Sequence, residues 1–371
     1  MEKFKFLLNS PVIIIYILFF FILGIFKIYI FRIDIKRIGH FVGYVTKLNR
    51  FQKFKKCRIL ILHTNECCNK YLFEQLKNNI DKSYFINQSK LLNTAFYFYS
   101  KLFNYNASSL WLKNLYYLNH KDSPIKKPDL NSEISKKILK NLHLNSNDKW
   151  VCIFNRDSNY LLKKYPKEDF SHHSYRNYSI NDFENSIHYL IQKGYKVIRV
   201  GTHPENEANI KHPNYIDYAN SKYQSDFADV LLISNSKFCV FGSSGIVDIA
   251  LLFNIPVLRI NYVPIWDVFK DRYKHPIIFK KYYDESKEQF LSVEEIFDRK
   301  LDKIYYTNDF KKNRIKLINN SKNEILNIIK EFEIFESRDI KIKENMKDYE
   351  KLNSILNQSK ERYFLNPIEK N

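Results

Sequence analysis

Short apolar runs alternate with longer amphipathic stretches over most of the chain. In the second half, four runs have the length and composition of buried strands, at 150–154, 196–200, 237–241 and 256–261. Between the first two runs, apolar residues recur at the spacing of one helix face, and Gly194 follows as a stop. Strands that alternate with helices in this way predict an α/β fold with a parallel sheet.

The first half shows the same alternation less clearly. Residues 33–38 and 58–62 alternate like strands, and a helical pattern follows each of them. A chain of 371 residues is also long for a single α/β domain. We therefore predict two Rossmann-like domains. The predicted order is an N-terminal membrane anchor, a first domain, a linker, a second domain and a charged helical tail, at 1–32, 33–125, 126–148, 149–335 and 336–371.

The longest apolar run covers 11–26 and continues through 28–31 around Lys27. About 20 such residues cross a bilayer core, so the run predicts an N-terminal membrane helix. A buried core helix is the alternative, and the pattern leaves open whether the helix spans the membrane or lies in its interface. Only Lys3 and Lys5 precede the run, whereas many basic residues follow it, which predicts a cytoplasmic C-terminal portion.

The net charge of +20 narrows the choice of partners. The 60 Lys and Arg residues are scattered, and no motif interleaves them with aromatic residues, so we predict no nucleic-acid partner. A membrane surface with anionic lipids fits this charge better. The five cysteines show neither paired metal spacing nor a disulfide framework. We predict no metal site and no bound cofactor.

Small polar residues follow the apolar run 237–241, where a strand is expected to end and a helix to begin. Ser243, Ser244 and Gly245 let backbone N–H groups approach a ligand, and a helix start carries partial positive charge. This is the environment that a diphosphate needs, and ligands of parallel sheets bind at the carboxyl ends of strands. An ordinary turn with small residues for packing is the alternative.

Charged residues follow the other predicted strands in the same way. Arg156 and Asp157 come directly after 150–154; an Arg there can grip phosphate oxygens, and an Asp can orient it or act as a base. A surface ion pair is the alternative. Arg199 and Gly201 end the next run, and Asn261 ends the last one.

A polar loop at 171–176 contains two adjacent histidines and an arginine. His173 is the first candidate for a base or phosphate contact and Arg176 a candidate cation. A solvated loop is the alternative. In the first half, Gly39 and His40 occupy a strand-to-helix turn, where contact with a ligand and simple packing are equally plausible readings.

The order of these motifs resembles a little-characterised family of bacterial glycosyltransferases associated with surface polysaccharide synthesis. The family pattern appears here as 156–160 with Tyr160, as 173–176 and as 198–201. It continues at 217–218, 225–229, 244–245 and 261–264, and the early Arg-Ile-Gly-His element appears at 37–40. The chain departs from the family at Ser174, where the family commonly has Asp, so this chain has no carboxylate at that position.

This resemblance implies two facing α/β domains with a cleft between them, the GT-B-like arrangement, working without a bound metal. It implies transfer of a sugar from a nucleotide-diphosphate donor to a surface-polysaccharide or lipid-linked glycan acceptor, at the cytoplasmic face of the inner membrane. The donor site would contain the phosphate-binding candidates named above, with His173 and Asp157 as catalytic candidates and Gly39 and His40 on the acceptor or cleft side. The alternatives are a sugar-nucleotide epimerase or hydrolase, and a non-catalytic membrane-tethered binding or scaffold protein.

Overall fold

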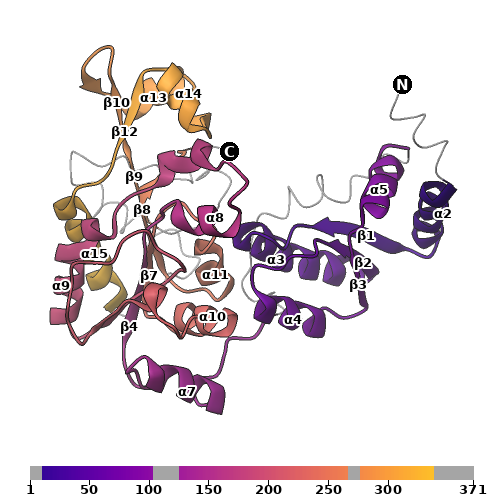
Figure 1. Cartoon of the computed structure of the whole chain (residues 1–371), viewed down its shortest axis with the longest axis horizontal. Helices are drawn as coiled ribbons and strands as arrows, with labels where there is room; N and C mark the ends of the chain where they lie inside the picture. Colours follow the sequence, from indigo (N-terminus) through magenta and orange to yellow (C-terminus); the bar gives the residue numbers. More distant parts are fainter. Residues whose placement is uncertain (1–10, 103–124, 266–275, 338–371) are drawn as a thin grey trace. The chain divides into compact units, whose positions relative to one another are not determined.

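A computed structural model describes residues 11–102, 125–265 and 276–337 of the chain. The chain divides into two compact units, residues 1–126 and 127–371, which we describe separately as the first and second unit (Figure 1). Both units are built from parallel strands joined by helices, so the predicted α/β class is confirmed. The predicted tail lies almost wholly outside the described residues.

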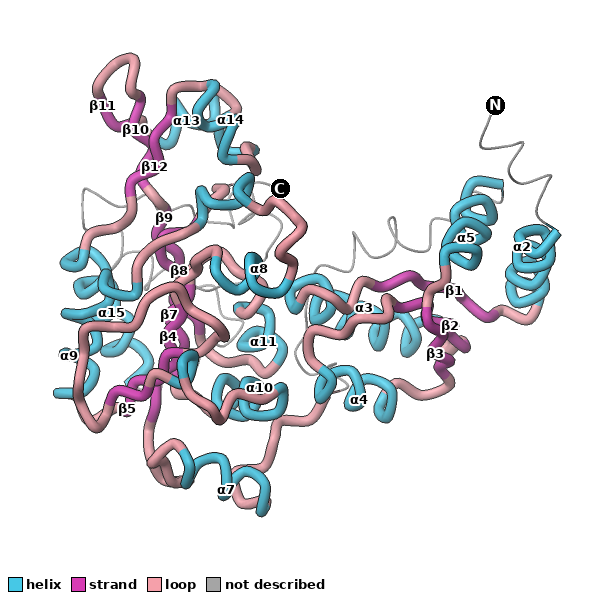
Figure 2. Tube along the Cα trace, viewed as in Figure 1, coloured by secondary structure: helices cyan, strands magenta, loops and turns pink. Residues whose placement is uncertain are grey.

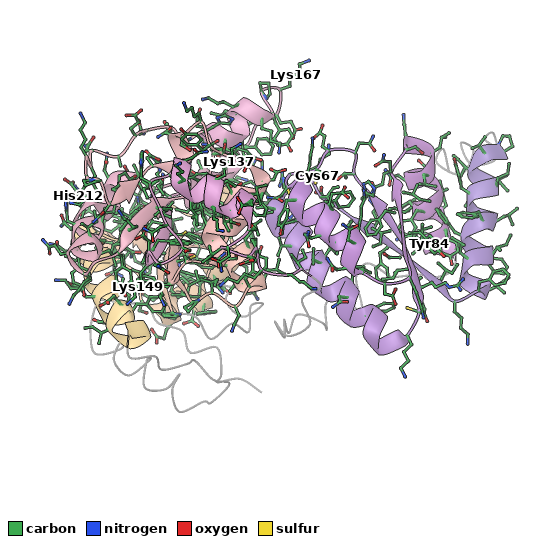
Figure 3. All side chains as sticks on the ribbon, turned by 90° about the horizontal axis from the view of Figure 1, so that it is seen from below. Cys67, Tyr84, Lys137, Lys149, Lys167 and His212 are labelled. Atoms are coloured by element: carbon green, nitrogen blue, oxygen red, sulfur yellow. The ribbon has the colours of Figure 1, made fainter. Side chains whose placement is uncertain are left out.

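The first unit contains a three-stranded parallel sheet in the order β1-β2-β3. Its elements, in chain order, are α2 (Pro11–Ile25), β1 (Ile28–Ile33), α3 (Ile38–Lys55), β2 (Arg58–His63), α4 (Lys70–Asn79), β3 (Ser83–Asn87) and α5 (Lys90–Leu102). The β2 sequence Arg-Ile-Leu-Ile-Leu-His is buried from its second residue on, as expected for the central strand of a sheet covered on both faces. Tyr84 lies on the outer strand β3 and is 52% exposed (Figure 3).

The N-terminal apolar run does not form one helix. Helix α2 ends at Ile25, Lys27 adopts a left-handed conformation with φ of 55°, and 28–31 belong to strand β1. The prediction of a membrane helix continuing to residue 32 is therefore wrong at its C-terminal end, because these β-branched and aromatic residues pair with β2 and bury Ile30 and Phe31. Within the described part of the chain, no helix has both the length and the apolar character needed to cross a membrane.

The second unit is built on a six-stranded sheet in the order β6-β5-β4-β7-β8-β9, with every neighbouring pair parallel. The strands are β4 (Trp150–Phe154), β5 (Lys196–Arg199), β6 (Tyr215–Ile216), β7 (Phe238–Phe241), β8 (Val257–Tyr262) and β9 (Ile277–Phe279). Four of them coincide closely with the predicted apolar runs, because strands buried on both faces are continuously apolar.

Helices cover both faces of this sheet (Figure 2). Those between and around the strands are α7 (Glu133–Asn141), α8 (Asn159–Lys164), α9 (Glu184–Gln192), α10 (Asp226–Ser234), α11 (Val247–Leu252) and α15 (Lys322–Ser337). Helices α9 and α15 pack on one face through a core that includes Ile187, Phe238 and Phe332. On the other face the Trp150 indole donates to the carbonyl of Leu232 in α10 at 2.8 Å. Short 3-10 helices complete the unit: η2 (Ser171–Arg176), η3 (Ile180–Phe183), η4 (Tyr218–Asn220) and η5 (Leu301–Lys303).

A small antiparallel sheet, in the order β11-β10-β12, follows β9. It consists of β10 (Lys281–Asp284), β11 (Gln289–Phe290) and β12 (Ile315–Ile318), with helices α13 (Val293–Asp298) and α14 (Thr307–Lys312) between the last two strands. Tyr282, Phe310 and Tyr175 share its core, which joins this sheet to the segment after α8. The predicted linker 126–148 contains α7, and Leu139 of that helix is buried.

Candidate functional site

The strand order of the second unit places a topological switch point between β4 and β7. From β4 the chain runs outward to β5 and β6, and it then returns to the other side of β4 to form β7 and β8. Ligands of such sheets bind where the connections diverge, outside the carboxyl ends of these strands. The loops that begin with Asn155 and Gly242 lie on the two sides of this point.

Tyr178 fills this switch point. Its hydroxyl donates to the carbonyl of Phe154, its backbone N–H donates to the carbonyl of Arg156, and its own carbonyl accepts from Asn155. Its ring packs so closely on Gly242 that a Cβ atom there would lie 2.5 Å from Cε1 of the ring. Burial raises the pKa of Tyr178 well above its usual value, so the hydroxyl stays protonated and continues to donate.

A buried lysine lies at the same carboxyl edge. Lys280 directly follows β9 and is 3% exposed; its Nζ donates to the carbonyls of Tyr175 at 2.9 Å and Asn177 at 2.7 Å. Burial lowers its pKa to about 7, the Asp182 carboxylate partly opposes this shift, and the positive charge of Arg156 adds to it. The positive charges of Lys280 and Arg156 therefore repel each other at this edge, and a bound anion would reduce that repulsion.

The Ser-Ser-Gly turn after β7 is in the predicted position. Ser243 is buried, and its hydroxyl accepts a hydrogen bond from the backbone N–H of Val263 at 2.8 Å, which ties the turn to the end of β8. Ser244 and Gly245 are half-buried and lead into α11. Of the three predicted donor contacts in this turn, Ser244 and Gly245 are thus the more accessible.

Arg199 does not reach the surface of this edge. It is 1% exposed, and its guanidinium donates to the side chain of Asn155, to the carbonyl of Asn206 at 2.7 Å and to the Asp217 carboxylate at 3.3 Å. Gly201 has φ of 115°, and a Cβ on it would lie 2.9 Å from the Phe154 ring. Arg199 therefore ties the end of β5 to Asn155, Asn206 and Asp217, and the absence of a side chain at Gly201 leaves room for the Phe154 ring.

Asn261 is also internal. It is fully buried, and it exchanges two hydrogen bonds with Asn320, each side-chain oxygen accepting from the backbone N–H of the other residue at 2.8 and 2.6 Å. Its φ of 49° lies in the left-handed region, which Asn tolerates better than most residues. The side-chain oxygen of Asn261 is therefore engaged within the fold, by the backbone N–H of Asn320.

Asp157 holds a loop in place. One of its carboxylate oxygens accepts from the backbone N–H of Asn159 at 3.0 Å, and the other accepts from the backbone N–H of Glu205 at 3.1 Å. It borders a polar cavity of about 240 Å³. The cavity is lined by Asn155, Asp157, Asn177, Tyr178, Ser179, Ile180, Glu205 and Asn206.

His173 belongs to an aromatic group on η2. Its ring lies 4.0 Å from that of His172 and parallel to Tyr306 at 6.3 Å, measured between ring centroids. Thr307 fastens η2 to the start of α14, because its hydroxyl donates to the carbonyl of Ser171 and accepts from a backbone N–H of η2. The imidazole is thus held on a fixed element and is half-buried.

The remaining predicted residues are dispersed. Arg176 packs over the ring of Tyr175 at 5.4 Å, and the Tyr160 hydroxyl accepts from Lys164 at 2.9 Å. Gly39 and His40 lie in the first unit at the start of α3, where His40 Nδ1 is 3.4 Å from an Asp34 oxygen. Their acceptor-side role stays a prediction. Over residues 11–102, 125–265 and 276–337, no group of three or more His, Cys, Asp or Glu side chains is placed to hold a metal ion.

Sequence reasoning missed Lys280 and Tyr178. Lys280 carries the same signal as Arg156, a cationic residue directly after an apolar strand, but its strand 277–279 is only three residues long. Tyr178 has no sequence signal, because its role depends on a glycine 64 positions later in the chain.

Solved structures that resemble the chain share little sequence identity with it. No family model matches the chain, and no curated protein sequence matches it. One similar solved structure is the iron-containing dodecameric glycosyltransferase TibC of enterotoxigenic E. coli H10407, with 13% identity, 68% of this chain and 62% of that chain covered, and a TM-score of 0.39. The match therefore covers less than two thirds of the TibC chain.

Two further structures have similar scores. The E. coli ADP-heptose LPS heptosyltransferase II shows 14% identity and a TM-score of 0.39, with 62% of this chain and 84% of that chain covered. A family 9 glycosyltransferase from Veillonella parvula DSM 2008 shows 10% identity and a TM-score of 0.42, with 74% and 91% covered. Likeness at this level does not establish a shared activity.

Proposed function

We propose that the chain is a glycosyltransferase that takes a sugar from a nucleotide-diphosphate donor. The observation that carries this proposal is that two basic residues lie at the carboxyl edge of the second sheet, beside its switch point: the carbonyl of Arg156 accepts from the backbone N–H of Tyr178, and Lys280 Nζ donates to the carbonyl of the preceding residue, Asn177. A diphosphate leaving group develops negative charge as the sugar departs, and fixed cations and helix starts stabilise that charge. The half-buried Ser244 and Gly245 add backbone N–H groups at the same edge.

In this proposal the second unit binds the donor, and the acceptor is a surface polysaccharide or a lipid-linked glycan at the cytoplasmic face of the membrane. His173 is the proposed base, since its ring is half-buried on an anchored helix, whereas both oxygens of Asp157 already accept backbone N–H groups. Base catalysis of this kind contributes roughly 100-fold or more to a rate.

The test is nucleoside-diphosphate release from a panel of nucleotide sugars by the purified chain, measured with a lipid-linked glycan acceptor present. Arg156→Ala removes a charge-assisted contact of about 1.5–3 kcal/mol, so the affinity for the nucleoside diphosphate should fall roughly tenfold or more. Arg58→Ala, at an exposed position on β2, is the matched control and should leave this affinity unchanged. His173→Ala should slow release with little effect on donor binding.

Three outcomes count against the proposal. If the wild type releases nucleoside diphosphate and Arg156→Ala binds it as tightly as the wild type does, Arg156 is not part of the donor site. Donor binding without release for every sugar, with or without added acceptor lipid, assigns the chain to the non-catalytic binding class. Release of free sugar that no acceptor captures favours a hydrolase.

A further inference from the structure

The outer face of α2 is apolar and exposed. Ile15 is 61% exposed and Ile25 63% exposed, and Phe26 directly after the helix is 71% exposed. The other large apolar residues on this face are between 41% and 55% exposed: Val12, Ile14, Leu18, Phe19, Phe21 and Ile22. A contiguous apolar surface of this kind marks an interaction site.

The inner face of the same helix is fixed by the fold. Ile13, Ile17 and Phe20 are buried against α5, with the Phe20 ring packing edge-on against Phe96. Helix α2 has 15 residues and is therefore about 22 Å long at 1.5 Å per residue. A helix held along one side by a folded unit presents only its opposite side to a partner.

The chemistry of α2 favours lipid over protein as that partner. The only side chain of Pro11–Ile25 that can form a hydrogen bond is Tyr16, which packs against the core of the first unit. Protein interfaces surround an apolar centre with polar residues and contain about one hydrogen bond per 100–200 Å². The acyl boundary of a membrane requires none of these bonds.

Cations lie beside the exposed end of α2. The strands of the first sheet are parallel, with Ile28 paired to Arg58 and Ile59 paired to Ser83, so the residues that start the strands share one edge. That edge carries exposed basic side chains, with Asp81 as a counter-charge: Lys27, Lys56, Arg58 and Lys82. Residues 1–126 as a whole contain 20 Lys and Arg but only 6 Asp and Glu, so most of the net charge of +20 belongs to this part.

We propose that the outer face of α2 and Phe26 insert into the headgroup–acyl boundary of an anionic lipid surface, while the basic edge contacts the headgroups. Apolar insertion and electrostatic attraction then act together, and two such signals are what stable peripheral attachment requires. The inference deepens the proposed function, since it names the surface that would hold a transferase beside a lipid-linked acceptor.

The test is co-sedimentation of the full chain with vesicles of phosphatidylcholine alone or of phosphatidylcholine mixed with phosphatidylglycerol. The wild-type chain should bind the mixed vesicles, and more weakly the neutral ones. The triple variant Ile15→Ser, Leu18→Ser, Ile22→Ser should lose about tenfold or more in affinity for both. Replacing Lys27, Arg58 and Lys82 by Gln should lower the affinity for the anionic vesicles by about fivefold per charge removed.

The matched control is Ile134→Ser with Leu162→Ser, two exposed apolar positions of the second unit that are each 54% exposed. It should bind vesicles like the wild type. An equal loss in this control, or no vesicle binding by the wild type, overturns the inference. A wild-type dimer that the α2 variant converts to a monomer, without vesicle binding, assigns the face to a second copy of the chain.

Nucleoside-diphosphate release, measured with a detergent-solubilised acceptor and without vesicles, separates this inference from the proposed function. Intact release together with absent vesicle binding overturns only the membrane surface. Vesicle binding together with absent release, for all donors tested, overturns only the transferase. Unchanged thermal unfolding of the α2 variant shows that its loss of binding does not come from misfolding.

Discussion

In each unit, one edge strand of the parallel sheet is followed by a side chain that donates to two backbone carbonyls, but these two side chains differ in charge. In the first unit Gln88 follows β3 and donates to the carbonyls of Ile33 at 3.4 Å and Leu62 at 3.0 Å. In the second unit Lys280 follows β9 and donates to two carbonyls of the segment 175–177. The side chain that donates to the two carbonyls is a neutral amide in the first unit and an ionisable amine in the second unit.

This difference separates the roles of the two edges. The Gln88 amide is uncharged at any ordinary pH, so it keeps its hydrogen bonds and exerts little electrostatic attraction on a distant anion. Burial of the Lys280 ammonium is costly and lowers its pKa to about 7, and lysines shifted in this way cluster at functional sites. The candidate anion site therefore lies in the second unit, whereas the basic side chains named in the first unit are exposed on its surface.

At a fixed pH, the largest expected effect of a single substitution is at Gly242 in the second unit, with Gly43 in the first unit as its comparison. Gly242→Ala should lower the free energy of unfolding by about 2 kcal/mol or more, because its Cβ collides with the Tyr178 ring, which both neighbouring strand ends hold. Gly43→Ala in α3 meets nothing within 4 Å and should be neutral or stabilise by up to about 1 kcal/mol. Chemical denaturation followed by circular dichroism measures both.

Equal destabilisation by the two substitutions would contradict the crowded switch point in the second unit. Donor binding sharpens the result: Gly242→Ala should also weaken nucleoside-diphosphate binding, whereas Gly43→Ala should not.

The next effect concerns pH. The pKa of Lys280 falls from an ordinary 10.5 to about 7 on folding, so between these values the unfolded chain binds one more proton than the folded chain. The contribution of Lys280 to stability therefore rises with pH from about 7 to about 10, by at most about 1.4 kcal/mol per pH unit. Below about pH 7 the charged lysine exerts its full burial cost.

Urea denaturation at several pH values tests this slope. Lys280→Met should remove this slope. The unfolding free energy of the wild type minus that of Lys280→Met should therefore rise between pH 7 and pH 9, roughly as the linkage relation requires. Gln88→Met should lower stability by the same amount at each pH. A parallel pH profile for wild type and Lys280→Met would show that Lys280 keeps its ordinary pKa.

The smallest effects come from helix caps. The Asn69 side chain accepts from Leu72 N–H at the start of α4, and the Ser225 hydroxyl accepts from Ala228 N–H at the start of α10. Each Ala substitution should cost about 1 kcal/mol, more for the buried Asn69 than for the exposed Ser225. Scanning calorimetry should show each substitution lowering the transition of its own unit. A single transition lowered by both would mean that the two units unfold together.

The periodicity predicted the second unit well and the first unit poorly, for a physical reason. Strands such as β4 and β7 are continuously apolar and bounded by polar turns, so their limits are visible in the sequence. The run ending in 28–31 is equally apolar, and a short apolar segment does not reveal whether it is a helix or a strand. Here the pairing with β2, about 30 positions later, decides the outcome.

The candidate site shows the same limit at the level of single residues. Position after a strand correctly indicates that Arg156, Arg199 and Asn261 lie at the carboxyl edge, but it does not indicate which way their side chains turn. Arg199 turns inward because Asn206 and Asp217 accept its hydrogen bonds. Asn206 lies in the loop between β5 and β6 and Asp217 directly follows the two-residue strand β6, and neither segment has a periodic pattern. The strand pattern predicts where a residue lies in the sheet, but hydrogen-bond partners far away in the sequence determine the direction of its side chain.

The exchange of hydrogen bonds between Asn261 and Asn320 affects how the chain can be synthesised and shortened. These residues are 59 positions apart, and the backbone N–H of Asn261 is buried with the oxygen of Asn320 as its acceptor. A nascent second unit therefore cannot complete the end of its β8 strand until residue 320 has left the ribosome. For the same reason, a truncated chain that ends before residue 320 leaves a buried donor without its acceptor and, because α15 is also lost, exposes the core of the sheet.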